Sequence, residues 1–192
     1  MVDGARRDAV QNRARLLEAA RRVFRDAGPD VPLERIAAEA GVSRTTLHRH
    51  FVDRDALVAE LFAANVDEIE REAERAADAP EGVARLFHFA LRLQLQLPGS
   101  ARVTSRSDVP RFATLADRVE AAFLVAGSAA PGSGLHPGVE LADLMIAFPM
   151  ADAAVVEDRA ASRPIDVARV HLFLHRALFA RPWSSLDAGV DR

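Results

Sequence analysis

The amino-acid sequence predicts an all-α fold: an N-terminal three-helix helix-turn-helix domain followed by a larger helical domain, with about nine helices altogether. Apolar residues recur at steps of three and four over most of the 192 residues, which is the period of an amphipathic helix. No segment alternates apolar and polar residues for long enough to indicate a β-strand. Glycine and proline interrupt the helical pattern, so the individual helices can be separated.

The first predicted helix covers residues 8–28. Gly28 and Pro29 end it, because neither residue favours continuation of a helix. Arginines lie on the polar sides of this helix, and its apolar residues form one stripe. The stripe consists of Val10, Ala14, Leu17, Ala20, Phe24 and Ala27.

Two short helices follow and meet at a glycine. Residues 32–41 predict the second helix, in which Pro32 suits the first helical position and Gly41 suits a left-handed turn. Ser43 is a suitable N-cap for a third helix from Arg44 to about His50. Two short helices joined in this way form a helix-turn-helix, and its expected small core is made of Leu17, Phe24, Ile36, Val42, Leu47 and Phe51.

The rest of the chain carries longer helical patterns. Asp53 is the expected N-cap of a long fourth helix, and Pro149 is expected to kink a later one. The mixed composition of residues 101–111 predicts at most a short turn of helix. The small residues, glycines and proline in residues 128–136 predict a loop. The longer patterns cover residues 52–77, 81–97, 112–127, 137–159 and 164–180.

Composition excludes several classes of protein. The chain has no cysteine, which excludes disulfides, thiolate catalysis and cysteine-based metal sites. It has no apolar run of about 18–20 residues and no apolar stretch typical of a signal peptide, so we expect a cytoplasmic protein. The net charge is −3, but residues 1–54 carry eleven arginines against eight acidic residues. A basic N-terminal part on an acidic body fits an anionic partner at that end.

The stretch from Gly41 to Val52 contains two arginines, two threonines and two histidines but no acidic residue. A solvated amphipathic helix normally balances bases with acids, so this composition favours another explanation. Once Leu47 and Phe51 point into the core, the polar side chains are left on the outer face of the third helix. Arginine can read guanine and threonine can contact a thymine methyl group or a phosphate, so we predict that this helix lies in a DNA major groove.

The segment from Ile36 to Val58, "IAAEAGVSRTTLHRHFVDRDALV", closely resembles the DNA-binding signature of the tetracycline-repressor (TetR) family of bacterial transcriptional regulators. The resemblance extends back through "RLLEAARRVFRDAG" in the first helix and covers roughly the first sixty residues. The remainder of the chain carries no matching motif, although its length and its two terminal apolar helices are similar to the regulatory domain of that family.

The resemblance implies a DNA-binding domain over residues 1–53 and a ligand-binding and dimerisation domain over residues 54–192. It implies a homodimer paired through the last two long helices, a near-palindromic double-stranded operator and a small-molecule effector that releases DNA. No cofactor is expected. His48 stands where the family most often has tyrosine, and it adds a group that can become charged near neutral pH. The DNA-binding residues implied by position are Ser43, Arg44, Thr45, Thr46, His48, Arg49, His50 and Arg54. Further contacts with the DNA backbone could come from Arg6, Arg7 and Arg13.

The body helices suggest both an interface and a cavity. The last helix is apolar on too many sides for a monomer, and Leu174 lies in the middle of its expected dimer seam. A mostly apolar cavity with a histidine and an arginine would suit an apolar or amphipathic ligand, with an anionic group as one option. The candidate ligand-binding residues are Phe62, His88, Leu91, Arg92, Phe123, Met145 and Phe148, each of which could equally be a plain core or surface residue.

Two other kinds of function find less support. His171 and His175 have the spacing of metal ligands on one helix face, but no nearby acid completes a site, so we expect packing or interhelical hydrogen bonding. No phosphate loop, nucleophile motif or isolated carboxylate pair indicates an enzyme. A helical small-molecule-binding or interaction protein without a DNA role remains the alternative, and salt-dependent retention on DNA distinguishes it from a regulator.

Overall fold

The computed structural model describes residues 2–28, 30–79, 81–97, 110–127, 134–158 and 166–182. The described residues form eight helices and no strand, apart from one isolated antiparallel bridge between Leu135 and Phe179. The predicted short turn within residues 101–109 lies outside the described residues. The helices are α1 (Val2–Ala27), α2 (Leu33–Ala40), α3 (Arg44–His50), α4 (Arg54–Ala76), α5 (Gly82–Leu95), α7 (Pro110–Gly127), α8 (Leu141–Asp158) and α9 (Val167–Leu178).

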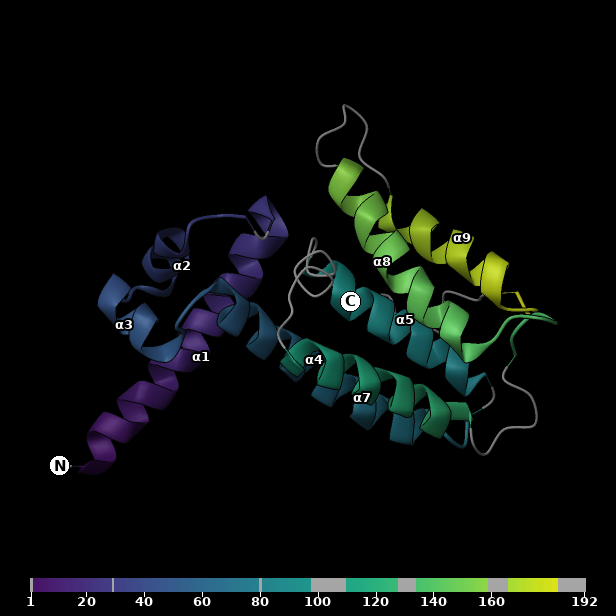
Figure 1. The fold of residues 1–192 in the computed structure, drawn as a ribbon, viewed down its shortest axis with the longest axis horizontal. Helices are drawn as coiled ribbons and strands as arrows, with labels where there is room; N and C mark the ends of the chain where they lie inside the picture. Colours follow the sequence, from purple (N-terminus) through teal and green to yellow (C-terminus); the bar gives the residue numbers. More distant parts are fainter. Residues whose placement is uncertain are drawn as a thin grey trace.

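The helices form two groups. Helices α1, α2 and α3 lie together at one end, and we call them the reading domain (Figure 1). Helix α4 starts beside this domain and runs into the body, where it packs along α7 (Figure 1). Helix α5 is the centre of the body, because it contacts α4, α7, α8 and α9. Helices α8 and α9 pack on each other at the outer side of the body.

Local signals in the sequence account for several helix ends. Gly41 adopts the left-handed conformation at φ 67°, which closes α2. Ser43 and Asp53 cap α3 and α4, and their side chains accept hydrogen bonds from the backbone N–H groups of Thr46 and Ala56. Pro149 lies inside α8 as predicted. Pro32 differs from the prediction, because it precedes α2 as the capping residue and is not its first helical residue.

The predicted apolar stripe of α1 is partly wrong. Ala20 and Phe24 are buried, but Val10 is 66% exposed and Ala14 and Ala27 are also exposed. The buried residues of α1 are Leu16, Ala19, Ala20, Val23 and Phe24. Adjacent residues Leu16 and Leu17 allow two stripes of the same period, and contact with α2 and α4 selects the one that contains Leu16.

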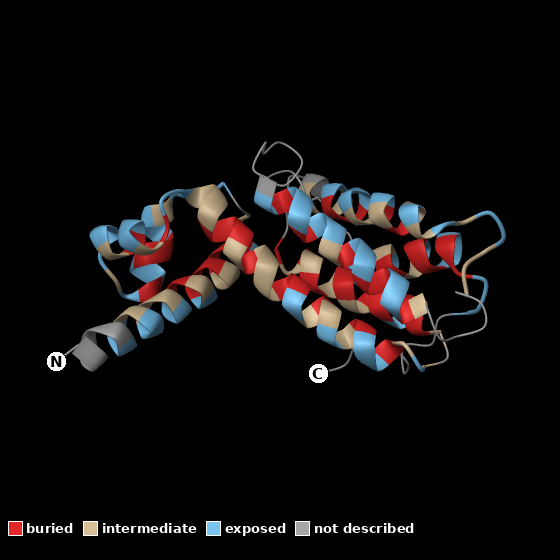
Figure 2. Cartoon of the chain, turned by 60° about the horizontal axis from the view of Figure 1, so that its bottom comes forward, coloured by how far each residue is buried: buried red, intermediate tan, exposed pale blue. Residues whose placement is uncertain are grey.

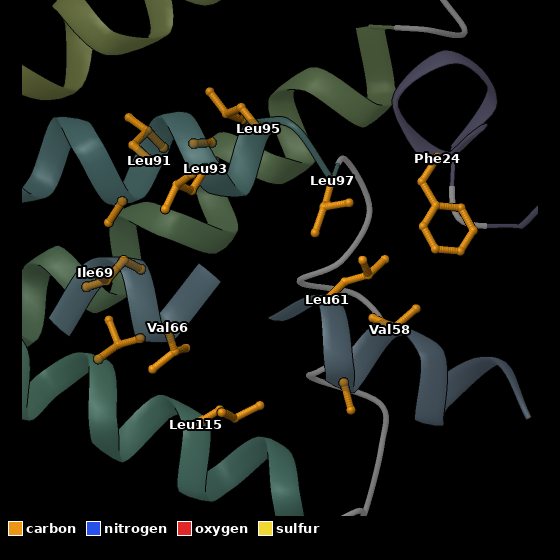
Figure 3. Close-up of a cluster of buried hydrophobic side chains, with 14 of the residues drawn as sticks. Phe24, Val58, Leu61, Val66, Ile69, Leu91, Leu93, Leu95, Leu97 and Leu115 are labelled. Carbon is orange, nitrogen blue, oxygen red and sulfur yellow. The ribbon is translucent and has the colours of Figure 1, made fainter. Parts of the chain in front are cut away.

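One apolar core extends from the reading domain into the body. Phe24 of α1 lies near Val58 and Leu61 of α4 and near Leu97 beyond α5 (Figure 3). Further along α4, buried residues face α5 and α7, and buried positions line the inner sides of all the body helices (Figure 2). Helix α4 therefore contributes buried side chains to both parts of this core.

Candidate nucleic-acid interface and ligand cavity

Helix α3 presents a polar face because its two apolar anchors point inward. Leu47 and the following Phe51 are buried in the reading domain. Ser43 Oγ lies 3.1 Å from the backbone N of Thr46 and 2.9 Å from Thr46 Oγ1, which holds the first turn. Of the residues predicted to contact DNA, Thr46, His50 and Arg54 are half-buried. The exposed ones are Ser43, Arg44, Thr45, His48 and Arg49, and they form one surface on and beside α3.

An acidic residue from α2 lies next to this surface. Arg44 Nη2 lies 3.1 Å from Glu34 Oε1, and Arg44 Nε donates to His48 Nε2 over 3.4 Å. Both partners of the ion pair are exposed, so the pair is worth little and Arg44 can leave it. The acid-free stretch of sequence did not reveal Glu34, because this residue comes from the preceding helix.

Arg13 holds the reading domain together. Its Nη1 donates to the backbone oxygen of His50 at 3.3 Å, and its guanidinium carbon lies 4.7 Å from the centre of the Phe51 ring. Its Nη2 also pairs with Glu60 of α4 at 3.0 Å. These contacts favour a structural role for Arg13 over the predicted contact with the DNA backbone. The side chain of Arg6 lies outside the described residues, and Arg7 is exposed.

His50 and Arg54 also face the interior. His50 Nε2 is buried, and burial lowers the pKa of His50, with the charges of Arg49 and Arg13 acting in the same direction. The Arg54 guanidinium donates from Nη2 to the backbone oxygen of Val31, and its Nη1 is buried. Arg54 therefore ties the start of α4 to the α1–α2 connection, and its contact with a phosphate stays a prediction.

A cavity of about 300 Å³ lies between α4, α5, α7 and α8. Its wall is mainly apolar, and the polar residues in it are Asn65, Gln94, Asp117 and Glu120. Gln94 Nε2 donates to the backbone oxygen of Phe148 at 2.9 Å. The apolar lining residues are Phe62, Val66, Ile69, Ala90, Leu93, Ala116, Val119, Met145, Phe148 and Pro149. This size and lining are typical of a site for a small, largely apolar ligand.

Three of the seven predicted ligand-binding residues line this cavity: Phe62, Met145 and Phe148. Leu91 and Phe123 are fully buried in the core and do not line it. Arg92 is half-buried, with its guanidinium carbon 5.2 Å from the centre of the Phe89 ring, and does not line it either. The wall therefore lacks the predicted histidine and arginine. Asn65 interrupts an apolar stripe of α4 between Leu61 and Ile69, and this signal could have identified it from the sequence.

His88 belongs to a separate cluster of three buried histidines. Its Nδ1 lies 3.1 Å from His171 Nδ1, and its Nε2 lies 2.9 Å from His175 Nδ1. His175 Nε2 donates to the backbone oxygen of Arg181 at 2.7 Å. The interhelical hydrogen bonding expected for His171 and His175 is therefore present, and it links α5 to α9. Within the described part of the chain, no three such groups are arranged to hold a metal ion.

Helices α8 and α9 expose an apolar surface, which we call the α8–α9 face. Phe173 is 68% exposed, and Ile146, Met150 and Val167 are also exposed. A groove of about 590 Å³ runs between the two helices. Leu174 differs from the predicted seam, because it is only 5% exposed within the single chain. It packs inside the body, since α9 turns this side towards α5 and α8. None of the helices described combines the length and apolarity that a bilayer span requires.

Sequence comparison assigns the reading domain to a known family. Residues 16–61 match the family described as "Bacterial regulatory proteins, tetR family". An HTH-type transcriptional regulator of Staphylococcus aureus is 42% identical over 53 residues, which cover 27% of this chain and 29% of that protein. A second regulator, from strain USA300, is 36% identical over 63 residues and 34% of its length. The chain thus matches about a third of the length of these curated relatives.

Structure comparison extends the likeness to the whole fold. A TetR family transcription regulator from Marinobacter aquaeolei VT8 aligns with a TM-score of 0.57 at 22% identity, over 92% of this chain and 100% of that one. A gamma-butyrolactone receptor described as ArpA-like aligns with a TM-score of 0.54 at 22% identity, over 89% and 90% of the two chains. The similarity of fold over most of the chain agrees with the sequence match in the reading domain. Residues 16–61 are therefore similar in sequence to the tetR family of bacterial regulatory proteins, and the chain shares the overall fold of these solved structures.

Proposed function

We propose that this protein is a ligand-responsive, DNA-binding transcriptional regulator, and specifically a repressor that a small apolar or amphipathic effector releases from its operator. The exposed, acid-free face of α3 is the observation that carries this proposal. The DNA major groove is wide enough to admit an α-helix, and α3 with its cap offers it hydrogen-bond donors and one methyl group. These groups belong to Ser43, Arg44, Thr45, His48 and Arg49. The family match over residues 16–61 supports the same role, and the protein would act where DNA is, in the cytoplasm.

The α8–α9 face supports a homodimer. A pairing with two-fold symmetry would cover Phe173 and Met150 with the same residues of a second copy. Two reading domains related by two-fold symmetry would then contact two half-sites with the same orientation relative to the axis. The operator should therefore be near-palindromic, with half-site centres about 34–36 Å apart or a multiple of that distance.

The cavity supports a ligand with an apolar body and one hydrogen-bonding group. Its wall offers amides and carboxylates, so an anionic ligand is disfavoured by Asp117 and Glu120. The apolar side chains around Phe62 and Phe148 would enclose most of such a molecule. Because one structural neighbour is named a gamma-butyrolactone receptor, alkylated butyrolactones are one class of compound to screen.

In vitro selection from a random duplex library tests the DNA-binding part of this proposal. The wild-type protein should enrich a near-palindromic motif, and its affinity for that motif should fall steeply with salt, because phosphate contacts release counterions. The double variant Arg44→Ala/Arg49→Ala should enrich no motif. Enrichment of no motif by the wild-type protein, or an affinity that does not depend on salt, would contradict a regulator that binds DNA.

A further inference from the structure

Helix α1 is joined to α4 by two polar contacts of different character. Arg13 and Glu60 form an ion pair at 3.0 Å, and both side chains are more than a third exposed. Eight residues further along α1, Arg21 Nη1 donates to Asn65 Oδ1 at 2.9 Å, and Asn65 is only 2% exposed. An exposed ion pair contributes little, whereas a buried hydrogen bond to a charged group contributes more. The contact between Arg21 and Asn65 is therefore the stronger of these two polar links between α1 and α4.

Both polar atoms of the Asn65 amide form hydrogen bonds, the oxygen with a donor and the nitrogen with an acceptor. Its oxygen faces the Arg21 guanidinium, which can only donate, and its nitrogen donates to the backbone oxygen of Leu93 over 3.4 Å. These partners determine the orientation of the amide. Leu93 lies in the last turn of α5, and its backbone oxygen also accepts from the backbone N–H of Gln96 at 3.3 Å. Asn65 thus joins α1, α4 and α5 through one side chain.

Arg21 depends on this acceptor because it is partly removed from water. Burial is the largest influence on it and lowers the pKa of Arg21, while the Glu68 carboxylate acts in the opposite direction. A desolvated guanidinium that loses an acceptor keeps its desolvation cost without the compensating bond. Loss of the Asn65 oxygen would therefore favour a different position of α1 relative to α4, in which Arg21 regains solvent or another partner.

Asn65 is also part of the wall of the ligand cavity, between the apolar side chains of Phe62, Val66 and Ile69 on α4. The other amide in the wall, Gln94, is bonded to α8 within the body. A polar group of a ligand in this mainly apolar space can form a hydrogen bond with one of these two amides, or with Asp117 or Glu120, which are exposed on α7. Asn65 is the amide whose engagement would also change a bond to the reading domain.

We propose that Asn65 is the positioning residue that transmits occupancy of the cavity to the reading domain, because a ligand hydroxyl or carbonyl that engages its amide competes with Arg21 and Leu93. The proposal rests on the proposed function as a ligand-responsive regulator. A ligand that only fills the apolar volume would bind without breaking the link, and a ligand that carries one hydrogen-bonding group would release α1.

Matched ligands and matched variants test this proposal in the full chain. The absence of cysteine allows one spin label to be attached at Arg15→Cys, an exposed position of α1, so that a homodimer gives one distance between its two reading domains. The probes are 4-hexylphenol and hexylbenzene, which differ by one hydroxyl group. Isothermal titration calorimetry measures their binding, and pulsed electron paramagnetic resonance measures the distance. Both probes should bind the wild-type protein, and only 4-hexylphenol should shift the distance.

The variants Asn65→Leu and Arg21→Met each remove one partner at similar volume. Arg21→Met should still bind 4-hexylphenol, whereas Asn65→Leu should bind it more weakly because it lacks the amide that the hydroxyl engages. In both variants 4-hexylphenol should no longer shift the distance, and the double variant should behave like Asn65→Leu. Arg22→Met is the control, because Arg22 is adjacent in sequence but bonds to Glu18 and Glu39 within the reading domain. This control should keep the full shift.

Each remaining outcome contradicts a particular part of the argument. If Asn65→Leu or Arg21→Met binds 4-hexylphenol and keeps the shift, Asn65 does not transmit occupancy. If hexylbenzene shifts the distance as far as 4-hexylphenol does, filling of the cavity drives the change and the amide is not involved. If neither probe binds, or no distance between two labels is found, the proposed ligand site or homodimer is wrong, and this inference is rejected with it.

Discussion

At the scale of single residues, the three buried histidines form a hydrogen-bonded chain with one consistent set of neutral tautomers. The backbone oxygen of Arg181 can only accept, so His175 must carry its proton on Nε2 and accept at Nδ1. His88 must then donate from Nε2 and accept at Nδ1, and His171 must donate from its Nδ1. Protonation of His88 would place two donors against each other in a buried site, so this cluster stabilises the fold only while it is neutral.

Acid should therefore weaken the fold through this cluster. Burial is the main reason that the pKa of His88 falls to about 3 and that of His171 to about 4, from an ordinary value of 6.5. Between pH 6.5 and about 4, these two histidines bind protons in the unfolded chain but stay neutral in the folded chain. The free energy of unfolding therefore falls as pH falls. His88 and His171 should each contribute at most about 1.4 kcal/mol per pH unit in this range.

Urea unfolding between pH 7 and pH 4.5 measures this effect. The variant His88→Phe should lose stability less steeply with falling pH than the wild-type protein does. The control His48→Asn changes an exposed histidine and should retain the wild-type slope. Equal slopes for His88→Phe and the wild-type protein would show that the cluster does not resist protonation.

We predict that Arg44 contributes to the specificity of DNA binding. Arg44→Ala should weaken binding to the selected DNA motif by about 1–3 kcal/mol, and it should weaken binding to random DNA less, because a base contact carries specificity. Arg71→Ala is the control, since Arg71 is an exposed arginine of α4 in the body. Fluorescence anisotropy with both duplexes measures the two affinities. If Arg44→Ala alters neither, the DNA-reading surface lies elsewhere.

At the scale of helices, close approach of backbones sets the geometry around the cavity. A Cβ atom added at Gly82 would lie 2.1 Å from the backbone oxygen of Ala76 and 3.2 Å from that of Ala126. Only glycine therefore allows the start of α5 to lie against the end of α4 and near the end of α7. This contact holds three of the four helices that line the cavity in their relative positions.

Gly82→Ala should accordingly destabilise the protein by about 1–3 kcal/mol or more, because backbone atoms would have to move. Gly127→Ala is a matched control on α7, where the nearest atom to an added Cβ is Val83 Cγ2 at an ordinary 3.6 Å. This control should be neutral or slightly stabilising, as alanine favours the helix. Thermal unfolding of both variants measures the difference, and equal melting temperatures would contradict the close approach at Gly82.

At the scale of the whole molecule, the exposed α8–α9 face determines the expected assembly. Phe173→Glu would place a carboxylate in the proposed interface without disturbing the interior of the chain, because Phe173 is mostly exposed. Leu174→Glu would be a poor test, since Leu174 is already buried in the single chain. Phe173, which is adjacent to Leu174 in the sequence, is therefore the informative position for this test.

We predict that Phe173→Glu gives a folded monomer that loses most of its affinity for a near-palindromic site, because the two half-sites no longer bind together. Leu124→Glu is the control, as Leu124 is an exposed apolar residue of α7 away from this face. Light scattering coupled to size-exclusion chromatography measures the mass. A dimer that persists in Phe173→Glu would place the interface on another surface.

Much of the fold could be predicted because its signals are local. The N-caps Ser43 and Asp53 bond to residues three positions away, and Gly41 closes α2 through its own backbone conformation. The helical period marked most of the helices, and the acid-free α3 marked the candidate DNA-binding surface. These features depend on interactions within a few residues, so the sequence by itself determined them.

Only the tertiary structure decided which residues meet across the chain. The link between Arg21 and Asn65 spans 44 positions, and the bonds from His88 to His171 and His175 span 83 and 87. The helical period could not distinguish Leu16 from Leu17 as the buried residue, nor assign His88 to a histidine cluster and Asn65 to the cavity wall. Periodicity defines a face of a helix, but packing against other helices selects the partner of that face, because burial depends on contacts between distant segments.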